Sequence, residues 1–161
     1  DCMGRMYPAA HRRFMQLPVN DRLAVFSDIL SFLECVVSRN YVAIDFYDGS
    51  IMYDFANGKT TICDIDLFRK QPCINDMGRM WGSSRFQSLE EYQLGADIDE
   101  ITNVYTLGAT AFALFGEYNR TREKWQLSDK LFEIATRAVS DDRTKRQQSI
   151  RQFTAEWEAA Q

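Results

Sequence analysis

The sequence predicts a mainly α-helical fold: a helical bundle around one buried central helix, with a small β-hairpin beside it. Apolar residues recur about every 3.6 positions in several segments, as they do on the buried face of a helix. Residues 99–115 are apolar on almost every side, which is typical of a helix buried all round. The pair Asn57-Gly58 is the strongest short signal for a hairpin turn. The 161 residues indicate one domain, residues 1–161, because a domain contains roughly 150 residues.

The first clear helix follows Pro18. We expect Asn20 to be its N-cap, because asparagine side chains accept hydrogen bonds from the first turn. The helix should end near residues 38–40, because residues 41–44 mostly favour β-structure. Its apolar face has the helical period: Leu23, Phe26, Leu30, Leu33 and Val37.

The hairpin is predicted over residues 50–64. Ile51, Tyr53 and Phe55 alternate with more polar neighbours, and a run of β-favouring residues follows the turn. Residues 66–88 have no sustained period and contain a proline and two glycines, so a long irregular segment is expected there. Segments of this length without regular structure are usually functional or disordered.

Three helices are predicted after this segment. Residues 99–115 form the buried helix described above, the spine of the domain. Residues 128–139 and 145–159 each have one apolar face, so each is predicted to be an amphipathic helix.

Composition excludes several classes of protein. The chain has 19 Lys and Arg against 23 Asp and Glu, a net charge of −4, and no long basic run, which argues against a nucleic-acid-binding protein. No apolar run is long enough for a membrane span, and the first residues do not resemble a signal peptide. We expect a reduced, cytoplasmic protein and, because the chain begins with Asp1, a piece of a longer one.

Metal-binding and nucleophile motifs are largely absent. Gly58-Lys59-Thr60 lacks the earlier glycine of a phosphate-binding loop and is better explained as the hairpin turn. His11, the single histidine, has no nucleophile motif near it and is expected on the surface. No zinc site is expected, because the cysteines lack metal-ligand spacing: Cys2, Cys35, Cys63 and Cys73.

Two carboxylates remain as candidates for chemistry. Asp45 precedes the predicted hairpin and Asp64 ends it, so the antiparallel strands should bring both to the same end. Such a pair suits Mg²⁺ and phosphate, since Mg²⁺ commonly takes one or two carboxylates plus phosphate oxygens. By position alone, the two could equally be solvated turn residues.

Five segments occur in an order and at a spacing that point to one family. They are residues 42–52 (VAIDFYDGSIM), 62–66 (ICDID), 82–90 (GSSRFQSLE), 103–108 (NVYTLG) and 141–146 (DDRTKR). In that order they resemble the catalytic loop, the D-F-G region, the A-P-E segment, the start of the central helix and the D-P-x-x-R stretch of protein kinases. From about residue 20 to its end, the chain is similar to the C-terminal lobe of eukaryotic-like Ser/Thr protein kinases, and bacterial members look closest.

The resemblance implies site residues. Asp45 is the catalytic aspartate that accepts or orients the substrate hydroxyl proton, and Asp64 binds Mg²⁺ on the nucleotide phosphates. Ser50 stands where the family has an asparagine that binds a second metal. Tyr47 replaces the lysine that contacts the γ-phosphate, and Ser83 replaces the threonine that marks Ser/Thr-directed kinases.

The resemblance also implies two supporting contacts. Glu90 and Arg146 should form a buried ion pair that braces the substrate loop. Asn103 replaces an aspartate that accepts hydrogen bonds from the catalytic loop, so it should lie buried against residues 43–46. Because charge-assisted bonds are stronger than neutral ones, restoring the aspartate is expected to tighten the loop.

Departures from the family pattern carry consequences. Ala43-Ile44 replaces the His-Arg of the catalytic loop, so the arginine that binds a phosphorylated activation loop is absent, and control by loop phosphorylation is not expected. Ile65-Asp66 replaces the Phe-Gly of D-F-G, which adds a negative charge near the expected phosphate position.

The upper kinase lobe has no counterpart here, because residues 1–20 are too few to contain it. The resemblance implies phosphoryl transfer from ATP, with Mg²⁺, to Ser or Thr of a protein substrate once an N-lobe is supplied by the same protein or a partner chain. The isolated chain should be almost inactive, since phosphoryl transfer depends on positioning. Two alternatives stay open: a pseudokinase lobe that acts as a binding or scaffolding module, and a plain helical interaction domain.

Overall fold

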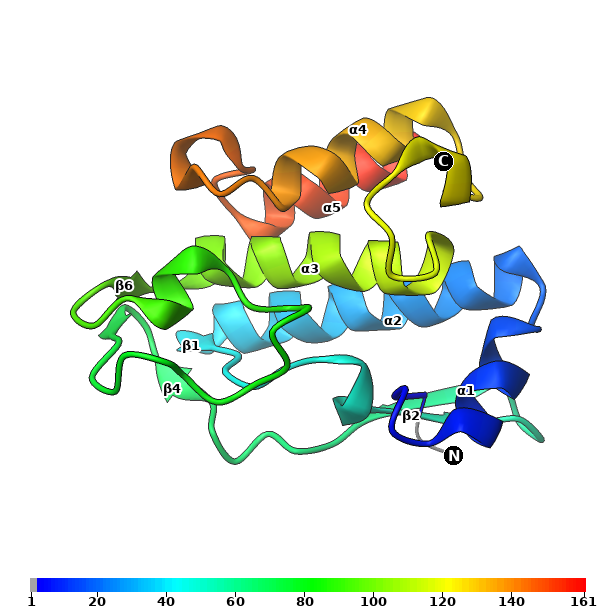
Figure 1. Cartoon of the computed structure of the whole chain (residues 1–161), viewed down its shortest axis with the longest axis horizontal. Coiled ribbons are helices and arrows are strands. Elements are labelled where there is room, and N and C mark those ends of the chain that lie inside the picture. The colour runs from blue at the N-terminus through cyan, green and yellow to red at the C-terminus, as the bar shows by residue number, and fades with distance from the viewer. Residues whose placement is uncertain (1–2) are drawn as a thin grey trace.

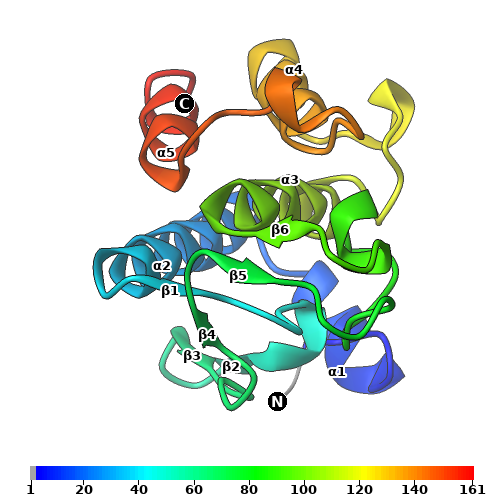
Figure 2. The same ribbon diagram turned by 90° about the vertical axis from the view of Figure 1, so that its left-hand side faces the viewer.

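The computed structural model describes residues 3–161. Its helices lie in layers (Figure 1): α2 (Val19–Ser38) and α3 (Glu100–Phe115) side by side in the middle, and α4 (Asp129–Ala138) and α5 (Ile150–Glu158) above them. The short helix α1 (Pro8–Met15) and the strand β2 (Ile51–Asp54) lie below α2, whereas the strand β6 (Asp97–Ile98) lies at the left end of α3. Figure 2, seen nearly along α2 and α3, shows the same order of layers from the strands up to α5.

α3 is the buried spine that the sequence predicts. Every residue from Thr102 to Phe115 is buried, and Asp99 caps the helix by accepting a hydrogen bond from the N–H of Ile101. Gly108 lets α4 approach closely, because a Cβ at this position would lie 2.7 Å from the Cβ of Ala138. The glycine of the NVYTLG segment therefore sets the packing of two helices.

The first two helices differ from expectation. α2 ends at Ser38 as predicted, but it begins at Val19 and its N-cap is Pro18, so assigning Asn20 as the N-cap was wrong. Pro18 has φ −49° and ψ 146°, an extended backbone that leads into the helix two residues earlier than an N-cap at Asn20 would. α1 was not predicted; it starts at Pro8, and Phe14 is its one buried residue, too little for a periodic pattern.

Three antiparallel strand pairs complete the fold. The predicted hairpin is confirmed as β2 (Ile51–Asp54) and β3 (Lys59–Ile62). Residues 66–88 are not wholly irregular, because two of the other short strands lie within them. The remaining pairs are β1 (Tyr41–Val42) with β4 (Arg69–Lys70), and β5 (Cys73–Ile74) with β6 (Asp97–Ile98).

The C-terminal helices are confirmed with one shifted boundary. α4 begins after Ser128, whose side chain accepts a hydrogen bond from the N–H of Leu131. α5 was expected from Lys145 but begins at Ile150, after Ser149 as its N-cap. The preceding residues are held by tertiary contacts instead, because the Arg146 side chain is fully buried.

His11, expected on the surface, is half-buried. Its Nδ1 lies 2.9 Å from the carbonyl oxygen of Met3, and its ring lies 5.6 Å from that of Tyr118. Within residues 3–161, no helix is both long and apolar enough to cross a bilayer.

Candidate active site

A cavity of about 400 Å³ opens where the hairpin, the loop after β1 and the loop before η2 (Leu89–Tyr92) meet the N-terminal segment. Four of the five predicted site residues line it: Asp45, Tyr47, Asp64 and Ser83. These side chains come from three separate parts of the chain, and the fold brings them together.

Asp45 and Asp64 face this one cavity. Both have left-handed backbone, with φ 59° and 56°, a conformation that aspartate tolerates better than most residues. Asp45 is half-buried and Asp64 is exposed. Burial, and then the negative charge of Asp64, raise the pKa of Asp45. A raised pKa makes Asp45 a better proton acceptor than an ordinary aspartate.

Ser50 lies behind this pair and does not line the cavity. It is fully buried, and its hydroxyl lies 3.4 Å from the carbonyl oxygen of Asp45, to which it donates. Its own carbonyl accepts a 2.9 Å hydrogen bond from the N–H of Cys63, the residue before Asp64. Ser50 therefore connects the loops that carry the two aspartates.

Tyr47 and Ser83 are partly buried at the cavity wall. The Tyr47 ring lies 6.4 Å from that of Phe86 and covers Gly49 so closely that a Cβ there would collide with it. The Ser83 hydroxyl is 3.4 Å from the Nε of Arg85, which donates to it.

The backbone before Asp45 is fixed from two sides. Asn103, fully buried as predicted, forms two hydrogen bonds with the main chain of Ala43. Ile44, which stands at the family's arginine position, packs in a small apolar cluster with Val42, Met80 and Ile98. Apolar packing of Ile44 thus joins the loop to the segment after β5. The kinase pattern has a charged arginine at the position of Ile44.

The predicted ion pair between Glu90 and Arg146 is confirmed. Two bonds of 2.6 and 3.0 Å join the groups, and the Glu90 and Arg146 side chains are 6% and 0% exposed. Arg143, which the sequence did not single out, lies 3.1 Å from Glu90 and also binds Asp99. Burial raises the pKa of Glu90, but the hydrogen bond and charge of Arg146 outweigh it, so the pKa is lowered overall.

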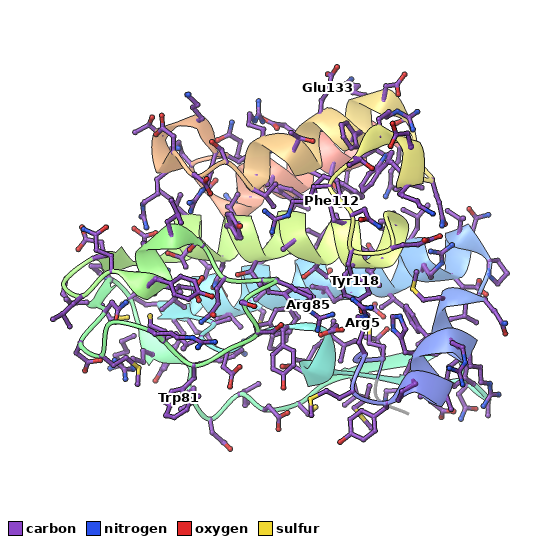
Figure 3. All side chains as sticks on the ribbon, viewed as in Figure 1. Arg5, Trp81, Arg85, Phe112, Tyr118 and Glu133 are labelled. Carbon is purple, nitrogen blue, oxygen red and sulfur yellow. The ribbon has the colours of Figure 1, made fainter. Side chains whose placement is uncertain are left out.

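Sequence reasoning missed a second polar cluster at the cavity: Asp48, Arg5, Arg85 and Tyr118. The Asp48 carboxylate is almost wholly buried and accepts bonds from the N–H of Arg5 at 3.1 Å, from the Tyr118 hydroxyl at 2.6 Å and from Arg85 at 3.5 Å. Figure 3 shows Arg5, Arg85 and Tyr118 close together between α3 and the strands. The partners are 43, 70 and 37 residues from Asp48, so no local pattern pointed to them.

Comparison with known proteins agrees with this architecture. No protein-family model matches the chain, and no curated protein matches it. The structure is similar to that of the kinase PK-1 of Cydia pomonella granulovirus, with a TM-score of 0.68 and 12% sequence identity. The match covers 86% of this chain and 58% of the viral kinase, so the chain spans less than two thirds of that protein. This chain has a kinase-like, mainly helical fold.

Proposed function

We propose that this chain is the catalytic and substrate-binding lobe for phosphoryl transfer from ATP to Ser or Thr of a protein substrate. The observation that carries the proposal is that Asp45 and Asp64 line one cavity and lie close enough for the charge of Asp64 to raise the pKa of Asp45. The kinase-like fold agrees with it.

Each aspartate has its own role in this proposal. Asp45 accepts or orients the proton of the substrate hydroxyl, a role that its raised pKa favours. Ser83 and Tyr47, on the same wall, contact the substrate and help to orient its hydroxyl. Asn103, Ser50 and the Glu90–Arg146 pair are positioning residues, because they hold the loops and need not touch the substrate.

The carboxylate of Asp64 fits a magnesium ion carried by a nucleotide. It is exposed in the cavity, and within residues 3–161 no cluster of three His, Cys, Asp or Glu side chains makes a self-sufficient metal site. That donor set suits Mg²⁺, which usually takes one or two carboxylates and completes its shell with phosphate oxygens and water. Bound there with ATP, Mg²⁺ supplies positive charge to the phosphates. Ser50 can be a second ligand only if its hydroxyl turns away from Asp45.

The rest of the nucleotide site has to come from an N-lobe, in the same protein or a partner chain. The match to only 58% of the viral kinase is consistent with this need. Several large apolar side chains are exposed and are candidates to meet such a lobe: Met6, Tyr7, Ile65 and Leu67.

The second candidate is a pseudokinase lobe that binds or scaffolds. Tyr47 stands where the family has a lysine, and its ring packs over Gly49. This favours the pseudokinase candidate, because a phenol supplies no positive charge to a phosphate. Asp66, exposed beside Asp64, favours it too, since a further negative charge repels phosphate.

Phosphoryl transfer by the full-length protein with Mg²⁺ and ATP tests the proposal. Wild-type protein should phosphorylate Ser or Thr peptides, and Asp64→Asn should abolish this. Asp129→Asn, on the far α4 helix, is the matched control and should retain activity. If wild type and Asp64→Asn are equally silent with every substrate and metal, the chain is the scaffold of the second candidate.

A further inference from the structure

Two arginine side chains line the cavity that contains Asp45. Arg5 comes from the segment before α1, and Arg85 from the loop before η2. Both guanidinium groups lie on the ring of Tyr118, with their central carbons 5.0 and 4.8 Å from its centroid. The fold therefore gathers two positive charges at one wall of the proposed substrate site.

Direct contacts with carboxylates engage these two guanidinium groups only weakly. The buried Asp48 carboxylate is engaged by the main-chain N–H of Arg5 and by the Tyr118 hydroxyl, and Arg85 reaches it only at 3.5 Å, which is long for a hydrogen bond. The Arg5 guanidinium forms no ion pair with any residue between 3 and 161. Burial and Asp48 raise the pKa of Tyr118, so the phenol stays neutral. Of the three carboxylates that line the cavity, only Asp48 contacts these arginines; within residues 3–161, Asp45 and Asp64 form no ion pair with either guanidinium group.

Guanidinium groups with open N–H donors at a cavity wall are suited to an anion. The planar guanidinium presents paired N–H donors that match a carboxylate or phosphate, and its stacking on Tyr118 holds it in place. Arg85 is 35% exposed, and Arg5 is exposed, so donors of both remain open to a ligand. Arg85 also bonds Ser83, which places its guanidinium beside the residue proposed to seat the acceptor.

We propose that Arg5 and Arg85 select protein substrates with an anionic side chain, a carboxylate or a phosphate, close to the acceptor Ser or Thr. The inference rests on the proposed role of this cavity in binding a protein substrate. It adds a substrate class: acidic or previously phosphorylated segments. It also makes Arg5 and Arg85 specificity-determining residues rather than catalytic ones.

Peptide binding to the full-length protein tests this without requiring catalysis. The probes are fluorescein-labelled serine peptides in which the residues flanking the acceptor are aspartate, phosphoserine, alanine or lysine. Fluorescence anisotropy gives the affinity for each, and the first two separate a carboxylate from a phosphate. Arg5→Ala is the sharpest variant, because the bond to Asp48 comes from the Arg5 main chain and survives. Arg79→Ala, an exposed arginine outside the cavity, is the matched control.

We expect aspartate or phosphoserine peptides to bind better than the alanine peptide, and lysine peptides worst. Arg5→Ala and Arg85→Ala should each weaken the anionic peptides about tenfold, as loss of a charge-assisted hydrogen bond does, and leave the alanine peptide unchanged. Arg79→Ala should change nothing. The melting temperature of Arg5→Ala should stay close to that of wild type, because the substitution removes only an exposed guanidinium's contact with the Tyr118 ring.

Several results would overturn the inference: equal binding of all peptides, no binding of any, or an Arg5→Ala effect on ATP affinity alone. The last result would assign the anion to the nucleotide. Phosphoryl transfer without an acidic preference would leave the proposed function intact and refute this inference. Selective, Arg5-dependent binding without any transfer would support the inference and favour the pseudokinase candidate.

Discussion

Asn103 and Ala43 are joined by a reciprocal pair of hydrogen bonds. The Ala43 N–H donates to Asn103 Oδ1 at 2.8 Å, and Asn103 Nδ2 donates to the Ala43 carbonyl at 2.7 Å. The amide of Asn103 therefore uses its donor as well as its acceptor. An aspartate has no such donor when ionised, so the expectation that it would tighten the loop does not hold for this contact.

Asn103→Asp should destabilise the protein by about 1–3 kcal/mol, because it leaves the buried Ala43 carbonyl unpaired and facing a negative charge. Urea unfolding followed by circular dichroism measures this. Asn119→Asp, at an exposed asparagine that also donates to a carbonyl, is the matched control and should change little. Equal or greater stability of Asn103→Asp would show that the loop backbone rearranges to donate to the carboxylate.

Glu90→Ala should lower stability by about 3–5 kcal/mol, because it leaves the buried Arg146 guanidinium without its counter-charge. Arg143 loses a partner in the same change, although Asp99 still holds it. The control is Glu123→Ala, which removes an exposed glutamate. Comparing the thermal unfolding of the two variants isolates the effect of burial. An unchanged melting temperature for Glu90→Ala would refute the bracing role.

Glu91 should make stability depend on pH. Its carboxylate is buried, which raises its pKa to about 7, although the N–H and hydroxyl of Ser88 lower it in part. The folded state then binds more protons than the unfolded state between the ordinary pKa near 4.5 and about 7. This group's contribution to stability therefore falls as pH rises through that window, and it is constant above it.

Glu91→Gln removes that titration while keeping an oxygen that accepts from Ser88. Its stability relative to wild type should rise from pH 5 to pH 7 and then level off. Melting temperatures of both proteins over this range test the prediction. A difference independent of pH would mean that Glu91 is ionised throughout.

Asp64→Asn should lower the pKa of Asp45, because it removes a like charge and leaves only the effect of burial. The chain itself is sufficient for this experiment, in which NMR follows the Asp45 side-chain carboxyl carbon through an acid titration. Asn is the right replacement, since it also tolerates the left-handed backbone at position 64. An unchanged pKa would mean that the two carboxylates do not sense each other.

The sequence predicted those parts of the fold that depend on local patterns. The buried helix around Leu107, the helix within residues 128–139 and the hairpin turn at Asn57-Gly58 follow from the apolar period and from turn chemistry, and all are present. The start of α5 did not follow, because Arg146 is fixed by Glu90, which is 56 residues away in the chain. In residues 145–149, the tertiary contact of Arg146 decides the backbone conformation, although the sequence has a helical period there.

In the candidate site, too, residues in local sequence patterns could be predicted, and residues brought together by tertiary contacts could not. Asp45 could be recognised because it follows a strand-like run, and Asp64 because it ends the hairpin. The order of the five kinase-like motifs pointed to Glu90 and Asn103. Asp48 could not be recognised as the centre of a cluster, because its partners come from the N-terminal segment, the loop before η2 and the turn after α3. The α1 helix was not predicted, because its eight residues include one buried side chain and so show no apolar period.

The rate of phosphoryl transfer in a double-mutant cycle of Asp45 and Asp64 tests the central claim most directly. The full-length protein is compared as wild type, Asp45→Asn, Asp64→Asn and the double variant, with Mg²⁺, ATP and a serine peptide. If the two aspartates act as one site, each single variant should lose nearly all transfer, and the double variant should be no slower than the singles. A wild type as slow as its variants, or single variants that retain wild-type rates, would contradict the account.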